Sequence, residues 1–115
     1  MKVFIFILIS IYSFSYSKAQ LVKQWDNRFG GTQADLPFSN IIETKNGYLL
    51  SGWSYGDSSY DKSQNNWSSW PDFWIVKSDL YGNKIWDKRF GGYTAEILYA
   101  SSMAKDGGYL LGGYS

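Results

Sequence analysis

The sequence predicts an all-β fold made of antiparallel four-stranded repeat units, arranged like the sheets of a β-propeller. The first observation is an internal repeat, because Trp25-Asp26-Asn27-Arg28-Phe29-Gly30-Gly31 returns 61 residues later as Trp86-Asp87-Lys88-Arg89-Phe90-Gly91-Gly92. Residues 25–54 and 86–115 are identical at 13 of 30 positions, far above chance. The second observation is a high content of aromatic residues and Gly with no sustained helical period of apolar residues. A repeat of this length is typical of arrays whose units stack to bury their apolar faces.

The third observation is that runs of β-forming residues alternate with turn signals. We expect strands at residues 40–44, 48–54, 73–78 and 84–90, with the first two repeated at 101–105 and 109–115 and an earlier copy of the fourth at 24–29. Asn and Gly in Lys45-Asn46-Gly47 and Asp106-Gly107-Gly108 allow positive φ, as a tight hairpin turn requires. Residues 79–83 connect the third and fourth strands in the same way. Four short antiparallel strands in each unit are the pattern of a propeller blade.

The repeat also divides the chain into regions. Copy one covers about residues 25–85 and a partial copy two covers 86–115, within a β-repeat region at 20–115. The array is therefore incomplete, with about one and a half repeats, and we expect the chain to be the N-terminal fragment of a longer protein. The residues that recur at matched positions are expected to pack between sheets or to shape turns, and they are Trp25, Phe29, Gly30, Gly31, Tyr48, Trp86, Phe90, Gly91, Gly92 and Tyr109.

The N-terminus has the order of a secretory signal peptide, predicted at residues 1–19. Lys2 precedes the apolar run 3–9, and a polar stretch ends in Ser17-Lys18-Ala19, which predicts cleavage before Gln20. A membrane anchor is the alternative, but the apolar run is shorter than the roughly 18 residues that span a bilayer. We therefore expect a secreted or cell-surface protein that has no membrane contact after cleavage.

Composition excludes several classes of function. The chain has 11 basic and 10 acidic residues and no cluster of Lys or Arg, so we expect no nucleic-acid partner. It contains no Cys, so disulfides cannot stabilise it, which favours a bacterial exported protein over a small eukaryotic one. The absence of His and Cys excludes Ser-His-Asp and Cys-His nucleophilic sites, His- or Cys-bound zinc and haem, and iron–sulfur clusters. We expect neither a cofactor nor an enzyme.

Carboxylates could still act as a pair in glycoside hydrolysis. Most of them, however, occupy matched repeat positions or turns, such as Asp26 and Asp87, where a structural role is expected. Asp57, Asp61 and Asp72 offer oxygen ligands for calcium in or beside a long loop. Their spacing does not match an EF-hand, and a solvated, turn-rich loop explains them better, so we predict no metal site.

That long loop, at residues 55–71, is where binding is expected, because long loops on rigid β scaffolds often carry function. It is rich in Ser, Asn and Asp and contains Tyr60, Trp67 and Trp70, whose ring faces could stack on sugars or on partner side chains. The alternative is that these rings cover a sheet edge or fill space between sheets. On the binding hypothesis the partner is a polysaccharide or a surface protein.

Four motifs occur in a fixed order, namely Asp72-Phe73-Trp74-Ile75-Val76-Lys77-Ser78-Asp79, Gly82-Asn83-Lys84-Ile85-Trp86, Arg89-Phe90-Gly91-Gly92 and Asp106-Gly107-Gly108-Tyr109. In this combination the chain resembles, from about Trp25 to Ser115, tandem repeats of large secreted and cell-surface proteins of the Bacteroidetes. The resemblance implies propeller-like β structure and brings no catalytic residues with it. Such proteins often carry a sorting domain for the type IX secretion system, and no such domain occurs in residues 1–115.

Three hypotheses of function follow. The leading one is a non-enzymatic secreted or cell-surface β-repeat scaffold or binding module. The second is a carbohydrate-binding module that uses Trp67 and Trp70 of the long loop. The third is part of a multi-blade enzyme whose active site lies outside residues 1–115.

Overall fold

The computed structural model describes residues 22–36 and 40–115, and within them the chain forms six β-strands and no helix. The strands are β1 (Asn40–Thr44), β2 (Gly47–Ser54), β3 (Asp72–Ser78), β4 (Lys84–Phe90), β5 (Ile97–Met103) and β6 (Tyr109–Tyr114). The prediction of an all-β, antiparallel fold is confirmed. The predicted signal peptide at 1–19 lies outside the described residues, among which no helix is long and apolar enough to cross a membrane.

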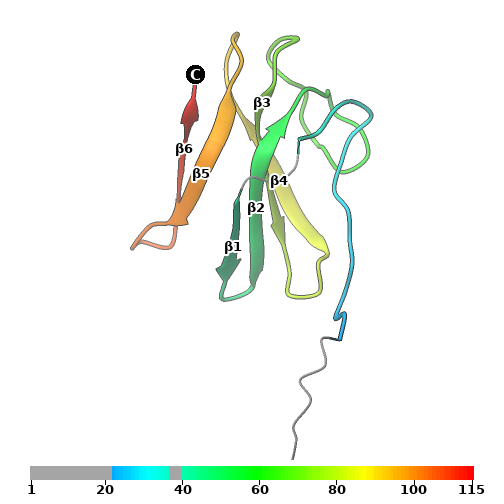
Figure 1. The fold of residues 1–115 in the computed structure, drawn as a ribbon, viewed down its shortest axis with the longest axis vertical. Coiled ribbons are helices and arrows are strands. Elements are labelled where there is room, and N and C mark those ends of the chain that lie inside the picture. Colours follow the sequence, from blue (N-terminus) through cyan, green and yellow to red (C-terminus); the bar gives the residue numbers. More distant parts are fainter. Residues whose placement is uncertain (1–21, 37–39) are drawn as a thin grey trace, which may run out of the picture.

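A four-stranded antiparallel sheet is the centre of the structure, with its strands in the order β1-β2-β3-β4 (Figure 1). Residues 45–46 form the turn between β1 and β2, and the turn between β3 and β4 is closed by Asp79, whose Oδ1 accepts hydrogen bonds from the backbone N–H groups of Tyr81 and Asn83. Gly82 has a φ of 80°, a conformation that only Gly adopts at little cost. Local turn chemistry therefore aligns the four strands.

The hairpin of β5 and β6 is a separate two-stranded sheet that packs on one face of the larger sheet, over β1 and β2 (Figure 1). Three buried side chains, Leu49, Ile75 and Leu98, form the core between the two sheets. Partly buried apolar side chains surround this cluster, and they are Ile42, Phe73, Trp86, Tyr109 and Leu111. Leu98 comes from copy two, so part of copy two completes the core of copy one.

The N-terminal segment at residues 22–36 covers part of the opposite face of the sheet (Figure 1). The ring of Trp25 lies 5.7 Å from that of Tyr48 and contacts the turn at Gly82, where an added Cβ would come within 2.4 Å of the Trp25 ring. Farther along, Tyr55 N–H donates to the carbonyl of Ala34. This segment also contacts the long loop, because Asp61 N–H donates to the carbonyl of Gly30.

One predicted strand is absent and another is displaced along the chain. Residues 24–29 form no strand, because a strand needs a neighbouring edge to pair with and Trp25 instead packs its ring on Tyr48. The strand expected at 101–105 begins earlier, as β5 at Ile97, with an irregular register between Leu98 and Ala100. The other strands agree with the prediction to within a residue at each end.

The two hairpins pair their strands in registers that differ by one residue. In copy one Ile41 lies opposite Leu50, whereas in copy two Ser101, not Ser102, lies opposite Leu111, the residue that matches Leu50. The turn of copy two is one residue longer, with Gly107 at a φ of 87°. A shift of one residue in the pairing exchanges the two faces of a strand. β5 therefore presents to the core the side chains that the register of copy one would turn away from it.

Candidate functional site

The loop at residues 55–71, predicted from its composition, forms no strand and crosses the end of the sheet beside the N-terminal segment. A tight turn organises its first half, in which Ser59 and Lys62 exchange backbone hydrogen bonds of 3.0 and 2.9 Å. Tyr60, inside that turn, has a φ of 47°. Such a conformation is uncommon for a residue other than Gly, and the surrounding hydrogen bonds maintain it.

A buried ammonium group organises the second half of the loop. The side chain of Lys62 is only 2% exposed, and its Nζ donates to the carbonyls of Gly56 and Gln64 and to Oδ1 of Asn66. Burial lowers the pKa of Lys62, and the negative charges of Asp72 and Asp57 partly offset that effect. Three acceptors around one cation compensate much of the cost of removing the charge from water.

Asn66 connects the loop to the sheet. Its Nδ2 donates to the carbonyls of Ser54 and Trp70, at 2.8 and 3.0 Å, and its backbone N–H donates to Oδ1 of Asp57. The loop is also connected to β4, because Ser63 N–H donates to Oδ2 of Asp87 at 2.8 Å. These bonds give the loop a defined shape without regular secondary structure.

The predicted aromatic residues of the loop are exposed. Trp67 and Trp70 are each 55% exposed and Tyr60 is 85% exposed. Trp67 lies beside Tyr93, with 6.1 Å between ring centroids and 48° between ring planes, and the guanidinium of Arg89 lies 4.8 Å from the centre of the Trp67 ring. The cation–π contact fixes the orientation of the ring on one side. The sequence alone does not indicate that Tyr93 and Arg89 contact Trp67, because they belong to β4 and to the segment after it, far from the loop along the chain.

A polar pocket of about 430 Å³ lies between this loop and the N-terminal segment. Its lining residues are Gln33, Tyr55, Asp57, Asn66, Ser68 and Ser69. Ser68 also accepts a hydrogen bond from Trp70 N–H, so the main chain of Trp70 lies beside a residue that lines the pocket. Tyr60 is separate, and it lines another pocket with Phe29 and Asp61. The structure therefore groups Trp67 with Tyr93, and places Tyr60 at a different site.

The three carboxylates considered as calcium ligands have protein partners. Asp57 accepts from Asn66 N–H, Asp61 accepts from Gly30 N–H at 3.1 Å, and Asp72 accepts from Trp67 N–H at 3.0 Å. Among the residues that the structure describes, no group of three or more acidic, His or Cys side chains could hold a metal ion. Each carboxylate thus binds the main chain of the loop or of the segment beside it.

A buried pair of acids lies beneath Trp67. Asp72 and Glu96 are 0% and 5% exposed, and their Oδ1 and Oε2 atoms lie where a Cβ on Gly91 would come within 2.3 and 2.9 Å of them. Neither oxygen accepts a hydrogen bond from the described protein groups, so a protonated Asp72 carboxyl that donates to Glu96 would satisfy both. Burial, together with Glu96, raises the pKa of Asp72, although Trp67 N–H and Arg89 oppose this.

The matched repeat residues take different positions in the two copies. Trp86 packs against the core, whereas Trp25 packs on Tyr48 at the other face. Gly30 N–H donates to Asp61, while Gly91 approaches Asp72 so closely that a side chain there would collide with it. Comparison of the chain with protein-family models, with curated proteins and with solved structures gave no match.

Proposed function

We propose that this chain is a non-enzymatic, exported β-repeat module of the propeller type, whose scaffold presents the loop at 55–71 to a partner. The observation that supports the scaffold is the packing of copy two on copy one. The side-chain amide of Asn40 donates to the carbonyl of Ser101 at 2.7 Å, and these two residues occupy the same position of successive repeats.

The path of the chain supports a radial array of sheets. The segment 91–96 leaves β4, at one edge of the four-stranded sheet, and leads to β5, which lies over β1 and β2 at the other edge. The first strands of successive repeats are therefore neighbours, while the fourth strand is remote from them. Propellers have this arrangement, because the first strands of their blades gather around a central axis.

A carbohydrate is the partner class that the loop favours. Trp67 and Trp70 are each 55% exposed, and the two residues between them, Ser68 and Ser69, line a pocket together with carboxylate and amide groups. Sugar rings stack their C–H faces on aromatic rings and pair their hydroxyls with such polar groups. The buried Lys62 and its three acceptors hold the loop in one shape, which reduces the entropy lost on binding.

A glycan array followed by tryptophan-fluorescence titration tests this proposal. The double change Trp67→Ala and Trp70→Ala should abolish binding with little change in melting temperature, because both side chains are exposed. Tyr81→Ala, which removes an exposed ring in the turn between β3 and β4, is the matched control and should leave binding intact. Absence of any glycan signal would exclude the carbohydrate, and hydrolysis of a bound glycan would contradict a non-enzymatic role.

A further inference from the structure

Two leucines at the same position of successive repeats have opposite environments. Leu49 on β2 is 0% exposed and lies in the core beneath Leu98, whereas its counterpart Leu110 on β6 is 63% exposed. The difference arises because the β5–β6 hairpin covers Leu49, while the described residues leave Leu110 open to solvent. The outer face of β5–β6 therefore corresponds to the face that this hairpin covers in copy one.

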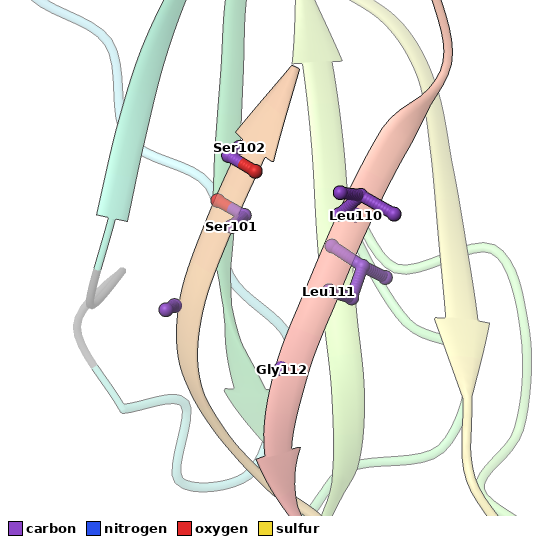
Figure 2. Close-up of a pocket in the computed structure, with 6 residues that line it drawn as sticks. Ser101, Ser102, Leu110, Leu111 and Gly112 are labelled. Atoms are coloured by element: carbon purple, nitrogen blue, oxygen red, sulfur yellow. The ribbon is translucent and has the colours of Figure 1, made fainter. Parts of the chain in front are cut away.

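The outer face of the β5–β6 hairpin is uncharged and has an open pocket of about 250 Å³ (Figure 2). Ser102 lies opposite Leu110 and Ala100 lies opposite Gly112, so these four residues share this face. We call them the Leu110 face.

The inner face of the β5–β6 hairpin, which covers Leu49, has a counterpart on the hairpin of β1 and β2. Ser101 and Leu111 are paired on the inner face of the second hairpin, and Ser101 Oγ lies 2.7 Å from Ser51 Oγ. In the first hairpin the corresponding pair is Ile41 and Leu50. Ile41 is 61% exposed, although it is a large apolar side chain in a strand. We call this pair the Ile41 face.

From this correspondence we propose that the Leu110 face of one copy of the chain binds the Ile41 face of a second copy, head to tail. Within one copy of the chain, the two sheets pack face to face. The proposed contact has the same packing, but between two copies. The two faces are different surfaces of the molecule, so the contact is heterologous, and it extends to a ring or to an open chain of copies. Burial of both apolar side chains, Leu110 on one face and Ile41 on the other, supplies its driving force.

Disulfide trapping tests the contact directly, because the natural chain contains no Cys. Within one copy Ser101 meets Ser51, so between copies Ile41 should meet Gly112, the counterpart of Ser51. A Cβ at Gly112 meets no atom within 4 Å, so a Cys fits there. Full-length chains with Ile41→Cys and with Gly112→Cys should form a mixed disulfide dimer when combined under mild oxidation.

The control is Leu80→Cys, at an exposed leucine in the turn between β3 and β4, combined with either variant. It should give far less of the disulfide dimer than the combination of Ile41→Cys with Gly112→Cys. If the mixed dimer forms no faster than the control dimers, or if Ile41→Cys links mainly to itself, the head-to-tail contact is refuted.

Association in solution gives a second measurement. Light scattering of the full-length chain should show concentration-dependent assembly that Leu110→Lys weakens at least tenfold, because a buried charge opposes the contact. Leu80→Lys adds the same charge at an exposed leucine outside the two faces, so this variant should assemble as the natural chain does. The two variants have the same N-terminus, so any effect of that segment on assembly is the same in both. Equal assembly of the two variants, or a natural chain that stays monomeric, overturns the proposal.

Discussion

Asn40 and Ser101 are 61 residues apart in the chain and are joined by a hydrogen bond of 2.7 Å from the Asn40 side chain to the Ser101 carbonyl. They also occupy the same position in the two copies of the repeat. The hydrogen bond joins the two sheets, because β5 of copy two lies over β1 and β2 of copy one. Residues that match in the sequence repeat are therefore in contact between the two sheets.

The first prediction concerns the core between those sheets. Leu49→Ala should destabilise the chain by about 2–5 kcal/mol, because Leu49 is fully buried against Ile75 and Leu98. Leu110→Ala, at the matched position of copy two, should change stability by less than about 0.5 kcal/mol in dilute solution. Urea unfolding followed by tryptophan fluorescence measures both. Equal losses would mean that the β5–β6 hairpin does not cover Leu49.

The second prediction concerns the buried indole of Trp74. Its Nε1 donates to Oδ2 of Asp87 at 3.0 Å, so Trp74→Phe removes a donor from a buried carboxylate. The loss should be about 1–3 kcal/mol in chemical unfolding. Trp70→Phe makes the same change at an exposed indole and should have little effect. A neutral Trp74→Phe would show that water replaces the indole at Asp87.

The third prediction separates backbone strain from packing at two glycines. Gly82 and Gly107 have φ of 80° and 87°, so Ala at either position should cost about 1–2 kcal/mol. An added Cβ at Gly107 meets no atom within 4 Å, whereas at Gly82 it would lie 2.4 Å from the Trp25 ring. Gly82→Ala should therefore cost more and should shift the tryptophan emission as Trp25 moves. Equal costs and equal spectra would contradict the packing of Trp25 on this turn.

The fourth prediction concerns acid. Burial by itself raises the pKa of Asp87, but hydrogen bonds from Ser63, Trp74 and Lys84 outweigh it and lower the pKa below its model-peptide value of 3.8. Below that value the unfolded chain binds more protons than the folded one, so the stability from Asp87 is lost as the pH falls through its folded pKa. Asp87→Asn should flatten the fall in unfolding free energy below about pH 4.

Asp72 supplies the opposite sign as a control. Burial raises its pKa, so the folded chain binds more protons than the unfolded one above pH 3.8, and stability falls as the pH rises through that range. Asp72→Asn should remove that fall, whereas Asp87→Asn should not. Urea unfolding at a series of pH values distinguishes the two. Identical pH profiles for the two variants would show that neither hydrogen bonds nor burial perturbs these carboxyls as described.

The sequence by itself determined the elements that depend on local chemistry. Turn residues such as Lys45-Asn46-Gly47 and Asp79 indicated where β1, β2, β3 and β4 begin and end, because a turn is decided by φ and by hydrogen bonds within a few residues. The same local reasoning located the loop at 55–71 with Trp67 and Trp70 in it, whereas the structure decided that both side chains are exposed. The offset between the repeats also indicated which residues correspond.

Only the tertiary structure decided what depends on a distant partner. Residues 24–29 match β4 in sequence yet form no strand, since Trp25 packs on Tyr48 instead of beside a strand edge. Lys62 is buried because three oxygens from the folded loop surround it, and Trp67 meets Arg89 and Tyr93 from elsewhere in the chain. Likewise Leu49 and Leu110 have the same sequence context but opposite burial. Burial of a side chain depends on which distant segment covers its face, and the residues around it in the sequence do not specify that segment.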